Sequence, residues 1–315
     1  MIEFKAITKE YANETALQAI NLKIDSRELF VLVGPSGSGK TTLLKTVNRL
    51  VVPTKGQVLI DGADVADTDL QTSRQHIGYV LQSSALFPNM TVMQNAAVQL
   101  EALGWSKTKI KPRIEHLLQL VDLDPKLYAD RKPAELSGGE AQRVGIVRAL
   151  AADPKLILMD EPFSALDPVS KRQLQNLILK LHQQLDTTIL FVTHDMQEAL
   201  RLADRMAVLH NGQLQQVGAS QTILEQPANA FVADFFKEVM ATQHTLNQVL
   251  AAGFGQPLTQ GSSQTIAPST SIYTWAAILK TDPHLVVQVG TKQLKASDLI
   301  SYLATLQKED RQDVE

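Results

Sequence analysis

Residues 1–218 alternate short, almost continuously apolar runs with stretches that have helical periodicity. Apolar runs without a polar face are typical of parallel strands that helices cover on both sides. The clearest runs predict strands at residues 30–33, 77–80, 156–160 and 188–193. Strands that alternate with helices in this way predict an α/β domain built around a mixed, largely parallel sheet.

Two parts of this domain depart from the alternation. A smaller antiparallel β portion is predicted at its two ends, including residues 206–210 and 213–217, and the Asn211-Gly212 pair between these runs favours a type I′ hairpin. Over residues 90–150 the strand pattern disappears and apolar positions recur at helical spacing. We therefore expect an inserted helical subdomain there.

The pattern changes again toward the C-terminus. Phe231, Phe235 and Val239 recur every four positions, which predicts an amphipathic helix that ends the first domain near residue 238. No charged residue occurs between residues 239 and 279, and Gln, Ser, Thr, Gly and Pro accumulate within this stretch. The composition predicts a linker over residues 239–271 and a small α/β extension over residues 272–315.

Composition narrows the possible functions. The 315 residues are 44% hydrophobic and 20% charged, the balance of an ordinary globular protein. Thirty basic side chains against thirty-three acidic ones give a formal charge of −3, so we expect no nucleic-acid partner. The absence of cysteine excludes disulfides, thiolate metal sites and cysteine nucleophiles. No apolar run approaches the roughly 18 residues of a membrane span, and no secretory signal is evident, so we expect any membrane role to act through a partner.

A glycine-rich segment, GPSGSGKT at residues 34–41, follows an apolar strand and opens a helical stretch. This context is typical of a phosphate-binding loop, in which backbone N–H groups and the helix N-terminus face phosphate oxygens. Lys40 would neutralise phosphate charge and the Thr41 hydroxyl would bind Mg²⁺. The alternative, a glycine-rich turn with an exposed lysine, does not explain the flanking strand and helix. The residues expected to bind the nucleotide, which the resemblance described below identifies as ATP, are Gly34, Pro35, Ser36, Gly37, Ser38, Gly39, Lys40, Thr41 and Thr42.

Further polar candidates lie at the C-terminal ends of two predicted strands, where open α/β sheets bind ligands. Asp160 is suited to the Mg²⁺ shell and Glu161 to polarising an attacking water. Taken alone, these two acids before Pro162 fit a solvated turn equally well, and the phosphate loop favours the catalytic interpretation. His194 ends another strand beside a helix-capping Asp195, which favours a catalytic role.

The segment LSGGEAQRVGIVRAL at residues 136–150 precedes the Asp160 strand, and this order of motifs over residues 1–238 resembles the ATP-binding subunits of ABC transporters. The resemblance implies an ABC-type P-loop NTPase fold that uses ATP and Mg²⁺. It implies a Q-loop at Gln82 that serves catalysis and the metal, a switch at His194, and Tyr11 stacked on adenine. The implied signature is Leu136, Ser137, Gly138, Gly139 and Glu140, and the implied D-loop is Ser164, Ala165, Leu166 and Asp167.

The signature residues themselves agree with the resemblance. Ser137 and the two glycines after it open a helix, which would form a second anion-binding N-terminus. In the family this second site faces ATP held by another subunit, which implies a dimer closed over two ATP molecules. Two positions depart from the family pattern. Glu140 stands where glutamine is more frequent, and Arg27 stands where a glycine usually precedes the glutamate of the turn.

Three segments, VNRL after the phosphate loop, LFPNMTV after Gln82 and PANAFVADFF at residues 227–236, resemble importer subunits for glycine betaine, carnitine and choline. This likeness implies transmembrane permease subunits, an extracellular or permease-fused substrate-binding protein, and a peripheral location on the cytoplasmic face of the membrane. The segment LKASDLISYL at residues 294–303 resembles the end of a CBS module. A partial CBS-like module and a solvated helix after a linker both remain open for the extension.

Other functions stay possible at this stage. One alternative is a transporter of another small zwitterion such as ergothioneine, and another is an exporter. A soluble ABC ATPase of translation or DNA repair is a different class. Translation-type members usually carry two such domains and repair-type members insert long coiled coils, and neither feature occurs in this sequence.

Overall fold

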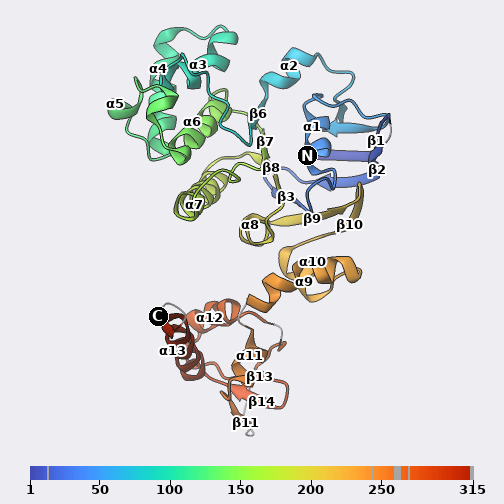
Figure 1. The fold of residues 1–315 in the computed structure, drawn as a ribbon, viewed down its shortest axis with the longest axis vertical. Coiled ribbons are helices and arrows are strands. Elements are labelled where there is room, and N and C mark those ends of the chain that lie inside the picture. The colour runs from blue at the N-terminus through green and yellow to red at the C-terminus, as the bar shows by residue number, and fades with distance from the viewer. Residues whose placement is uncertain (13, 243–244, 259–263, 269, 313–315) are drawn as a thin grey trace. The chain divides into compact units, whose positions relative to one another are not determined.

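A computed structural model describes residues 1–12, 14–242, 245–258, 264–268 and 270–312 of the chain (Figure 1). The chain divides into two compact units, Met1–Ala233 and Asp234–Glu315, and the division falls inside helix α10 (Ala230–Thr242). The predicted α/β class is confirmed. Among the described residues, no helix combines the length and the apolar character that a membrane crossing needs.

A six-stranded sheet forms the centre of the first unit, in the order β10-β9-β3-β8-β7-β6. Its strands are β3 (Leu29–Val33), β6 (Ile77–Val80), β7 (Leu156–Asp160), β8 (Thr188–Thr193), β9 (Arg205–His210) and β10 (Gln213–Gly218). Every neighbouring pair is parallel except β9 and β10. Strands β3, β7 and β8 are buried along their whole length, as expected for apolar strands between helical layers. The parallel order brings the C-terminal ends of β3, β8, β7 and β6 to one edge.

A second, antiparallel sheet has the order β2-β1-β4-β5 and lies beside α1 (Lys40–Val47) in Figure 1. Its strands are β1 (Ile2–Tyr11), β2 (Glu14–Ile24), β4 (Lys55–Ile60) and β5 (Ala63–Asp64). Leu43, Leu44 and Val47 of α1 share one buried cluster with residues of both sheets, such as Phe4 and Leu190. The helix that follows the phosphate loop is thereby fixed between the two sheets.

The smaller β portion differs from the prediction in one respect. The second sheet is built only from the N-terminal strands, whereas β9 and β10 extend the main sheet through pairing of β9 with β3. The predicted hairpin is confirmed, because His210 pairs with Gln213 across Asn211 and Gly212, which have φ angles of 48° and 71°.

Helices replace strands between β6 and β7, as the periodicity predicted. The elements are α3 (Val92–Ala102), α4 (Lys107–Leu120), α5 (Pro125–Tyr128), the short 3₁₀ helix η1 (Pro133–Glu135) and α6 (Gly138–Leu150). Figure 1 shows α3 to α6 grouped together, away from the antiparallel sheet. The remaining helices of this unit are α2 (Leu70–Gln75), α7 (Pro168–Gln184), α8 (Met196–Leu202) and α9 (Ser220–Glu225).

The second unit has a sheet in the order β11-β14-β13-β12. Its elements are α11 (Leu246–Ala251), β11 (Gln256–Pro257), β12 (Gln264–Thr265), α12 (Ile272–Thr281), β13 (Val287–Val289), β14 (Lys292–Leu294) and α13 (Ala296–Gln312). We predicted a linker over residues 239–271, and the described part of that range instead contains α11, β11 and β12. Leu246 and Val249 are fully buried in one cluster with Trp275. This unit therefore has its own core, to which the supposed linker contributes.

Candidate functional site

The phosphate loop connects β3 to α1, as predicted. Ser36 and Gly37 are exposed, and no atom lies within 4 Å of a Cβ placed on Gly37, which has φ +78°. Gly39 caps α1 with φ +100°, and a Cβ there would meet the Ala16 backbone oxygen at 2.6 Å. Only glycine fits this cap, so the backbone is free to present its N–H groups at the start of α1.

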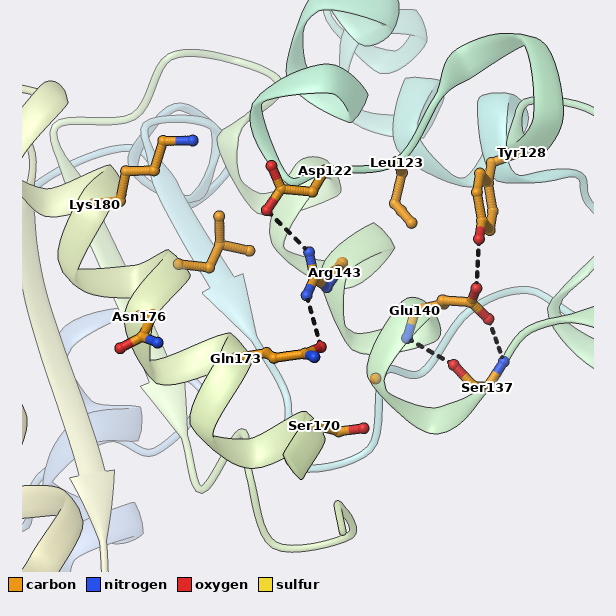
Figure 2. A pocket seen from close by; sticks show the side chains of 12 residues that line it. Asp122, Leu123, Tyr128, Ser137, Glu140, Arg143, Ser170, Gln173, Asn176 and Lys180 are labelled. Carbon is orange, nitrogen blue, oxygen red and sulfur yellow. Dashed lines mark hydrogen bonds and ion pairs between the residues drawn. The ribbon is translucent and has the colours of Figure 1, made fainter. Parts of the chain in front are cut away.

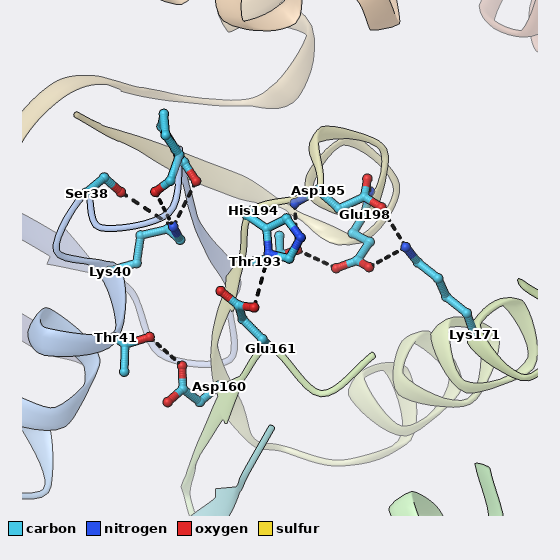
Figure 3. Close-up of polar contacts among 12 residues, drawn as sticks. Ser38, Lys40, Thr41, Asp160, Glu161, Lys171, Thr193, His194, Asp195 and Glu198 are labelled. Atoms are coloured by element: carbon cyan, nitrogen blue, oxygen red, sulfur yellow. Dashed lines mark hydrogen bonds and ion pairs between the residues drawn. The ribbon is translucent and has the colours of Figure 1, made fainter. Parts of the chain in front are cut away.

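Lys40 lies inside this loop with its side chain turned back (Figure 3). Its Nζ donates to the backbone oxygens of Gly34 and Pro35, both at 2.8 Å, and more weakly to Ser38 Oγ at 3.5 Å. Burial lowers the pKa of Lys40, while Glu161 and Asp160 raise it. No carboxylate oxygen of the described residues lies within 4.0 Å of Lys40 Nζ, so Lys40 forms no ion pair with them. A buried ammonium that has only neutral partners is suited to an incoming phosphate.

Asp160 ends β7 and faces the first turn of α1. Its Oδ1 accepts a hydrogen bond from Thr41 Oγ1 at 2.7 Å, and its Oδ2 lies 3.4 Å from the Tyr79 hydroxyl. Lys45 Nζ is 3.9 Å from the same Oδ2. A carboxylate and a hydroxyl in contact offer two hard oxygen ligands, which fits Mg²⁺ because this ion takes few protein ligands and completes its shell with water and phosphate. Thr41 and Asp160 would hold it.

Glu161 follows in the left-handed backbone region, with φ 46°. Its N–H donates to Val192 O at 3.0 Å, and its Oε2 lies 3.0 Å from Nδ1 of His194. The Glu161 side chain is 19% exposed and that of His194 is 51% exposed, so both can reach a ligand from solvent. Strained backbone at a charged residue is a feature of functional sites, because the surrounding fold must hold it. The two predicted catalytic side chains lie together, at the ends of neighbouring strands.

The signature opens α6 as predicted (Figure 2). Ser137 caps the helix, and Glu140 completes a capping box, with its Oε2 accepting from Ser137 N at 2.7 Å. The other Glu140 oxygen accepts from the Tyr128 hydroxyl at 2.6 Å, and these two bonds lower the pKa of Glu140. The carboxylate that replaces the usual glutamine is therefore satisfied locally.

The two signature glycines lie against the D-loop and the helix that follows it. A Cβ on Gly139 would lie 3.3 Å from Ser170, and one on Gly138 would lie 3.5 Å from Leu166. Asp167 caps α7 by accepting from Val169 N and Ser170 N, each at 3.0 Å. A cavity of about 600 Å³ opens beside the signature. Its lining includes Ser137, Gly139 and Glu140 and no residue of the phosphate loop.

Two side chains of α6 hold the segment that contains Gln82. Gln142 Nε2 donates to Leu81 O at 3.1 Å, and Arg148 donates to the backbone oxygens of Ser84 and Ala85 at 2.9 and 2.8 Å. The helix that begins with the signature is thus hydrogen-bonded to the backbone on both sides of Gln82.

Two expected ligand residues are not brought into the cluster. Gln82 is exposed after β6, and the described residues show no hydrogen bond between its side chain and Thr41 or Asp160. Tyr11 is 51% exposed at the end of β1, where Lys9 lies over its ring at 4.9 Å. An exposed ring is available for stacking. The roles of both residues stay predictions.

Sequence reasoning missed several side chains that support the site, among them Tyr79, Tyr128, Asn95 and Lys171. Tyr128 and Lys171 reach partners 12 and 24 positions away, and no motif marks them. Asn95 could have been found, because it is a polar residue in line with the apolar positions of its helix. In the structure it is completely buried.

Comparisons with known proteins agree with this geometry. Residues 17–164 match the family model of ABC transporters. The chain is 42% identical to the osmoprotectant import ATP-binding protein OsmV of Salmonella typhimurium, with 86% of this chain and 72% of that protein covered. It is 42% identical, with the same coverage, to the glycine betaine/carnitine/choline transport ATP-binding protein OpuCA of Bacillus subtilis. It is 43% identical to the glycine betaine uptake system ATP-binding protein YehX of Escherichia coli, with 75% and 76% covered.

A solved ATP-binding cassette, dimeric and bound to ADP and Pi in a post-hydrolysis state, is 33% identical with a TM-score of 0.63. The match covers 70% of this chain and 99% of that one. The fold of the first unit therefore has a counterpart in a nucleotide-bound ATP-binding cassette. The chain therefore belongs to the ABC transporter family, among its ATP-binding proteins.

Proposed function

We propose that this protein binds and hydrolyses ATP to energise an importer of quaternary ammonium osmolytes of the glycine betaine, carnitine and choline type. The relatives at 42–43% identity support the substrate class, because their names describe osmoprotectant and glycine betaine transport. The cluster of Lys40, Thr41, Asp160, Glu161 and His194 supports the chemistry.

The observation that carries the proposal is the separation of two anion sites within one chain. The phosphate loop is at the C-terminal end of β3, and the signature is at the start of α6, beside a cavity that no phosphate-loop residue lines. Each site ends in a helix N-terminus suited to phosphate. Two copies arranged head to tail would bring the signature of one to the phosphate loop of the other, so that each ATP is enclosed by both. The dimeric cassettes at 33–34% identity support this arrangement.

The chain's own residues divide the work of hydrolysis. Lys40 would exchange its two carbonyl partners for phosphate oxygens, and the loop N–H groups would hold the phosphate chain. Thr41 and Asp160 would hold Mg²⁺, which would neutralise charge on the phosphates. Glu161 would orient and deprotonate the attacking water, and His194, hydrogen-bonded to Glu161, would contact the terminal phosphate.

Permease subunits would dock beside Gln82. Phe87 and Met90, in the loop between β6 and α3, are 47% and 37% exposed. Buried Asn95 fixes this loop: its Oδ1 accepts from Phe87 N at 2.7 Å, and its Nδ2 donates to Phe87 O and Met90 O at 3.1 Å. A fixed apolar surface next to the Q-loop suits a short helix of a membrane partner. Such docking would hold the protein at the cytoplasmic face of the membrane, and a substrate-binding protein on the other side would select the osmolyte.

The second unit would be an accessory domain of the ATPase subunit, outside the proposed ATP site. Between residues 264 and 312, the described residues form β12, α12, β13, β14 and α13 around the core of this unit, which supports the proposal of a partial CBS-like module over residues 272–315. The boundary of the ATPase domain at residue 238 is likewise a proposal.

Uptake into proteoliposomes tests the function. The protein is reconstituted with its co-purifying membrane subunits, and uptake of radiolabelled betaine, carnitine, choline and ergothioneine is measured with and without ATP. We expect ATP-dependent uptake of at least one of the first three compounds. Uptake of ergothioneine alone would identify another zwitterion as the substrate. ATP hydrolysis without uptake of any compound would favour export or a non-transport ATPase.

Glu161→Gln is the matched control. The change keeps the shape of the side chain and removes the base, so ATP binding should persist while turnover falls by about 100-fold or more. Both are measured on the same preparation, by calorimetry and by phosphate release. Near-normal turnover of the variant would reject the role of Glu161.

A further inference from the structure

A three-membered ion cluster joins α7 to the loop that carries His194 (Figure 3). Lys171 Nζ, from the first turns of α7, lies 2.5 Å from Asp195 Oδ2 and 2.6 Å from Glu198 Oε1. The Glu198 side chain is only 6% exposed, and those of Lys171 and Asp195 are about 30% exposed. One cation thus holds two carboxylates in a partly buried place, where charge pairs are screened less than at the surface.

Both chain neighbours of His194 are tied to this one ammonium group. Asp195, which follows His194, binds Lys171 directly and also caps α8 by accepting from Gln197 N at 2.8 Å. Thr193, which precedes His194, donates its hydroxyl to Glu198 at 2.5 Å and accepts from Asp195 N at 2.9 Å. The imidazole of His194 takes part in neither of these two sets of contacts. It extends toward Glu161, so its place depends on a backbone that Lys171 fixes from both sides.

The other end of this link lies at the D-loop. Lys171 N donates to Asp167 O at 2.9 Å, one helical turn earlier, and Ser170 is the residue against which signature Gly139 packs. The start of α7 therefore touches the signature on one side and, through Lys171, the His194 loop on the other. A shift of α7 would move the backbone of His194 through a charged bond that is short and partly shielded from water.

We propose that Lys171 is a positioning residue for hydrolysis. From α7, the helix that follows the D-loop, it holds the loop of His194 so that the imidazole contacts Glu161. The proposal rests on the proposed function, since it concerns the same ATPase site. Without Lys171, the bond from α7 to Asp195 and Glu198 would be lost, and the loop between them would relax away from the 3.0 Å contact of His194 with Glu161. Displacement of a catalytic group by about 1 Å costs about 100-fold in rate.

Steady-state ATP hydrolysis by the full chain tests the proposal. Lys171→Met should lower kcat by about 10- to 100-fold while the KM for ATP changes less than about threefold, because the phosphate loop is untouched. Lys171→Arg, which can bind both carboxylates, should recover most of the rate. Arg172→Met is the matched control. It removes a positive charge from the next, exposed residue of the same helix, and it should leave kcat unchanged.

A second pair of variants separates positioning from stability. Lys171→Met alone leaves Glu198 buried and unpaired, which lowers the melting temperature. Lys171→Met/Glu198→Gln removes both charges, so it should recover melting temperature without recovering kcat. Recovery of kcat together with stability would reduce Lys171 to a structural role and overturn the proposal.

The decisive comparison uses His194→Ala. If Lys171 acts through His194, then Lys171→Met should have almost no further effect on kcat in the His194→Ala background. The same fold-loss in both backgrounds would overturn the proposal, and so would normal kcat in Lys171→Met. The proposed function is judged separately, by hydrolysis in the unaltered protein and its loss in Glu161→Gln.

Discussion

At the scale of single residues, the fold holds some residues in and near the site in backbone conformations that are unfavourable for residues other than glycine. Glu161 adopts φ 46°, and Arg27 adopts φ 63° at the position where a glycine is usual in the family. Arg27 is held by a bond from its N–H to Thr188 Oγ1 at 2.9 Å, and β3 begins two residues later without disturbance. The departure from the family pattern therefore stays local.

Lys40 gives the first prediction at this scale. Lys40→Ala removes the cation that the loop holds on the carbonyl oxygens of Gly34 and Pro35, so affinity for Mg-ATP should fall about 10- to 100-fold, or about 1.4–2.8 kcal/mol. Isothermal titration calorimetry measures the affinity. Lys23→Ala, an exposed lysine on β2, is the control and should bind normally. Unchanged affinity of Lys40→Ala would count against the phosphate role.

Asn95 gives the second prediction at the scale of single residues. Asn95→Asp keeps the shape of the side chain but replaces two N–H donors with a carboxylate that faces the carbonyl oxygens of Phe87 and Met90. We expect a loss of about 2–4 kcal/mol in unfolding free energy from this buried, repelled charge. Urea unfolding measures it, and Asn89→Asp in the same exposed loop should be nearly neutral. Equal stability of the two variants would show that Asn95 does not fix the loop.

How much of the site was predictable depends on the distance that a contact spans. The phosphate loop, the carboxylate pair and His194 could be placed because each follows an apolar strand, and parallel strand ends meet at one edge. The link from Lys171 to Asp195 could not, because it joins two helices whose packing no local pattern records. The contact of Tyr128 with Glu140 is hidden for the same reason.

At the scale of elements, strands and the inserted helices followed from apolar periodicity, and the second unit followed only in part, because an α/β extension was expected over residues 272–315 but a linker over residues 239–271. Its strands have two or three residues each, too short to show alternation. Helix α11 has six residues and begins with a capping box formed by Thr245 and Gln248. That signal is local and was hidden in a polar stretch without charges, so composition alone suggested a linker.

The start of α6 makes a pH-dependent prediction. Hydrogen bonds from Tyr128 and Ser137 hold the pKa of Glu140 below its usual 4.5. The folded protein thus binds this proton more weakly than the unfolded chain does. The resulting stability is present above about pH 4.5 and is lost as the pH falls through the lower folded pKa. In Glu140→Gln this component is absent, so the urea midpoint should fall less steeply between about pH 5 and 3 than in the unaltered protein.

Tyr128→Phe is the companion variant, because it removes only the hydroxyl that Glu140 Oε1 accepts from. It should give a slope between those of the unaltered protein and Glu140→Gln, since the bond to Ser137 N remains. Three parallel curves would show that Glu140 contributes nothing to the acid sensitivity of this helix.

At the scale of the whole molecule, two cores within one chain have a consequence for unfolding. The core of the first unit includes both of its sheets and α1, while ten buried apolar residues form the core in the described part of Asp234–Glu315. Small units bury a smaller fraction of their surface and are correspondingly less stable. ATP contacts only the first unit in the proposed site, so it should stabilise that unit alone.

The two tryptophans allow this to be measured, because Trp105 is 41% exposed in the first unit and Trp275 is fully buried in the second. In Trp105→Phe, fluorescence follows only the second unit during urea unfolding, while circular dichroism is dominated by the larger first unit. We expect the fluorescence transition at lower urea. Mg-ATP at about 100 times its Kd should stabilise the first unit by about 2.7 kcal/mol and leave the fluorescence midpoint in place. A single coincident transition, shifted equally by ATP in both signals, would mean that the two units unfold as one.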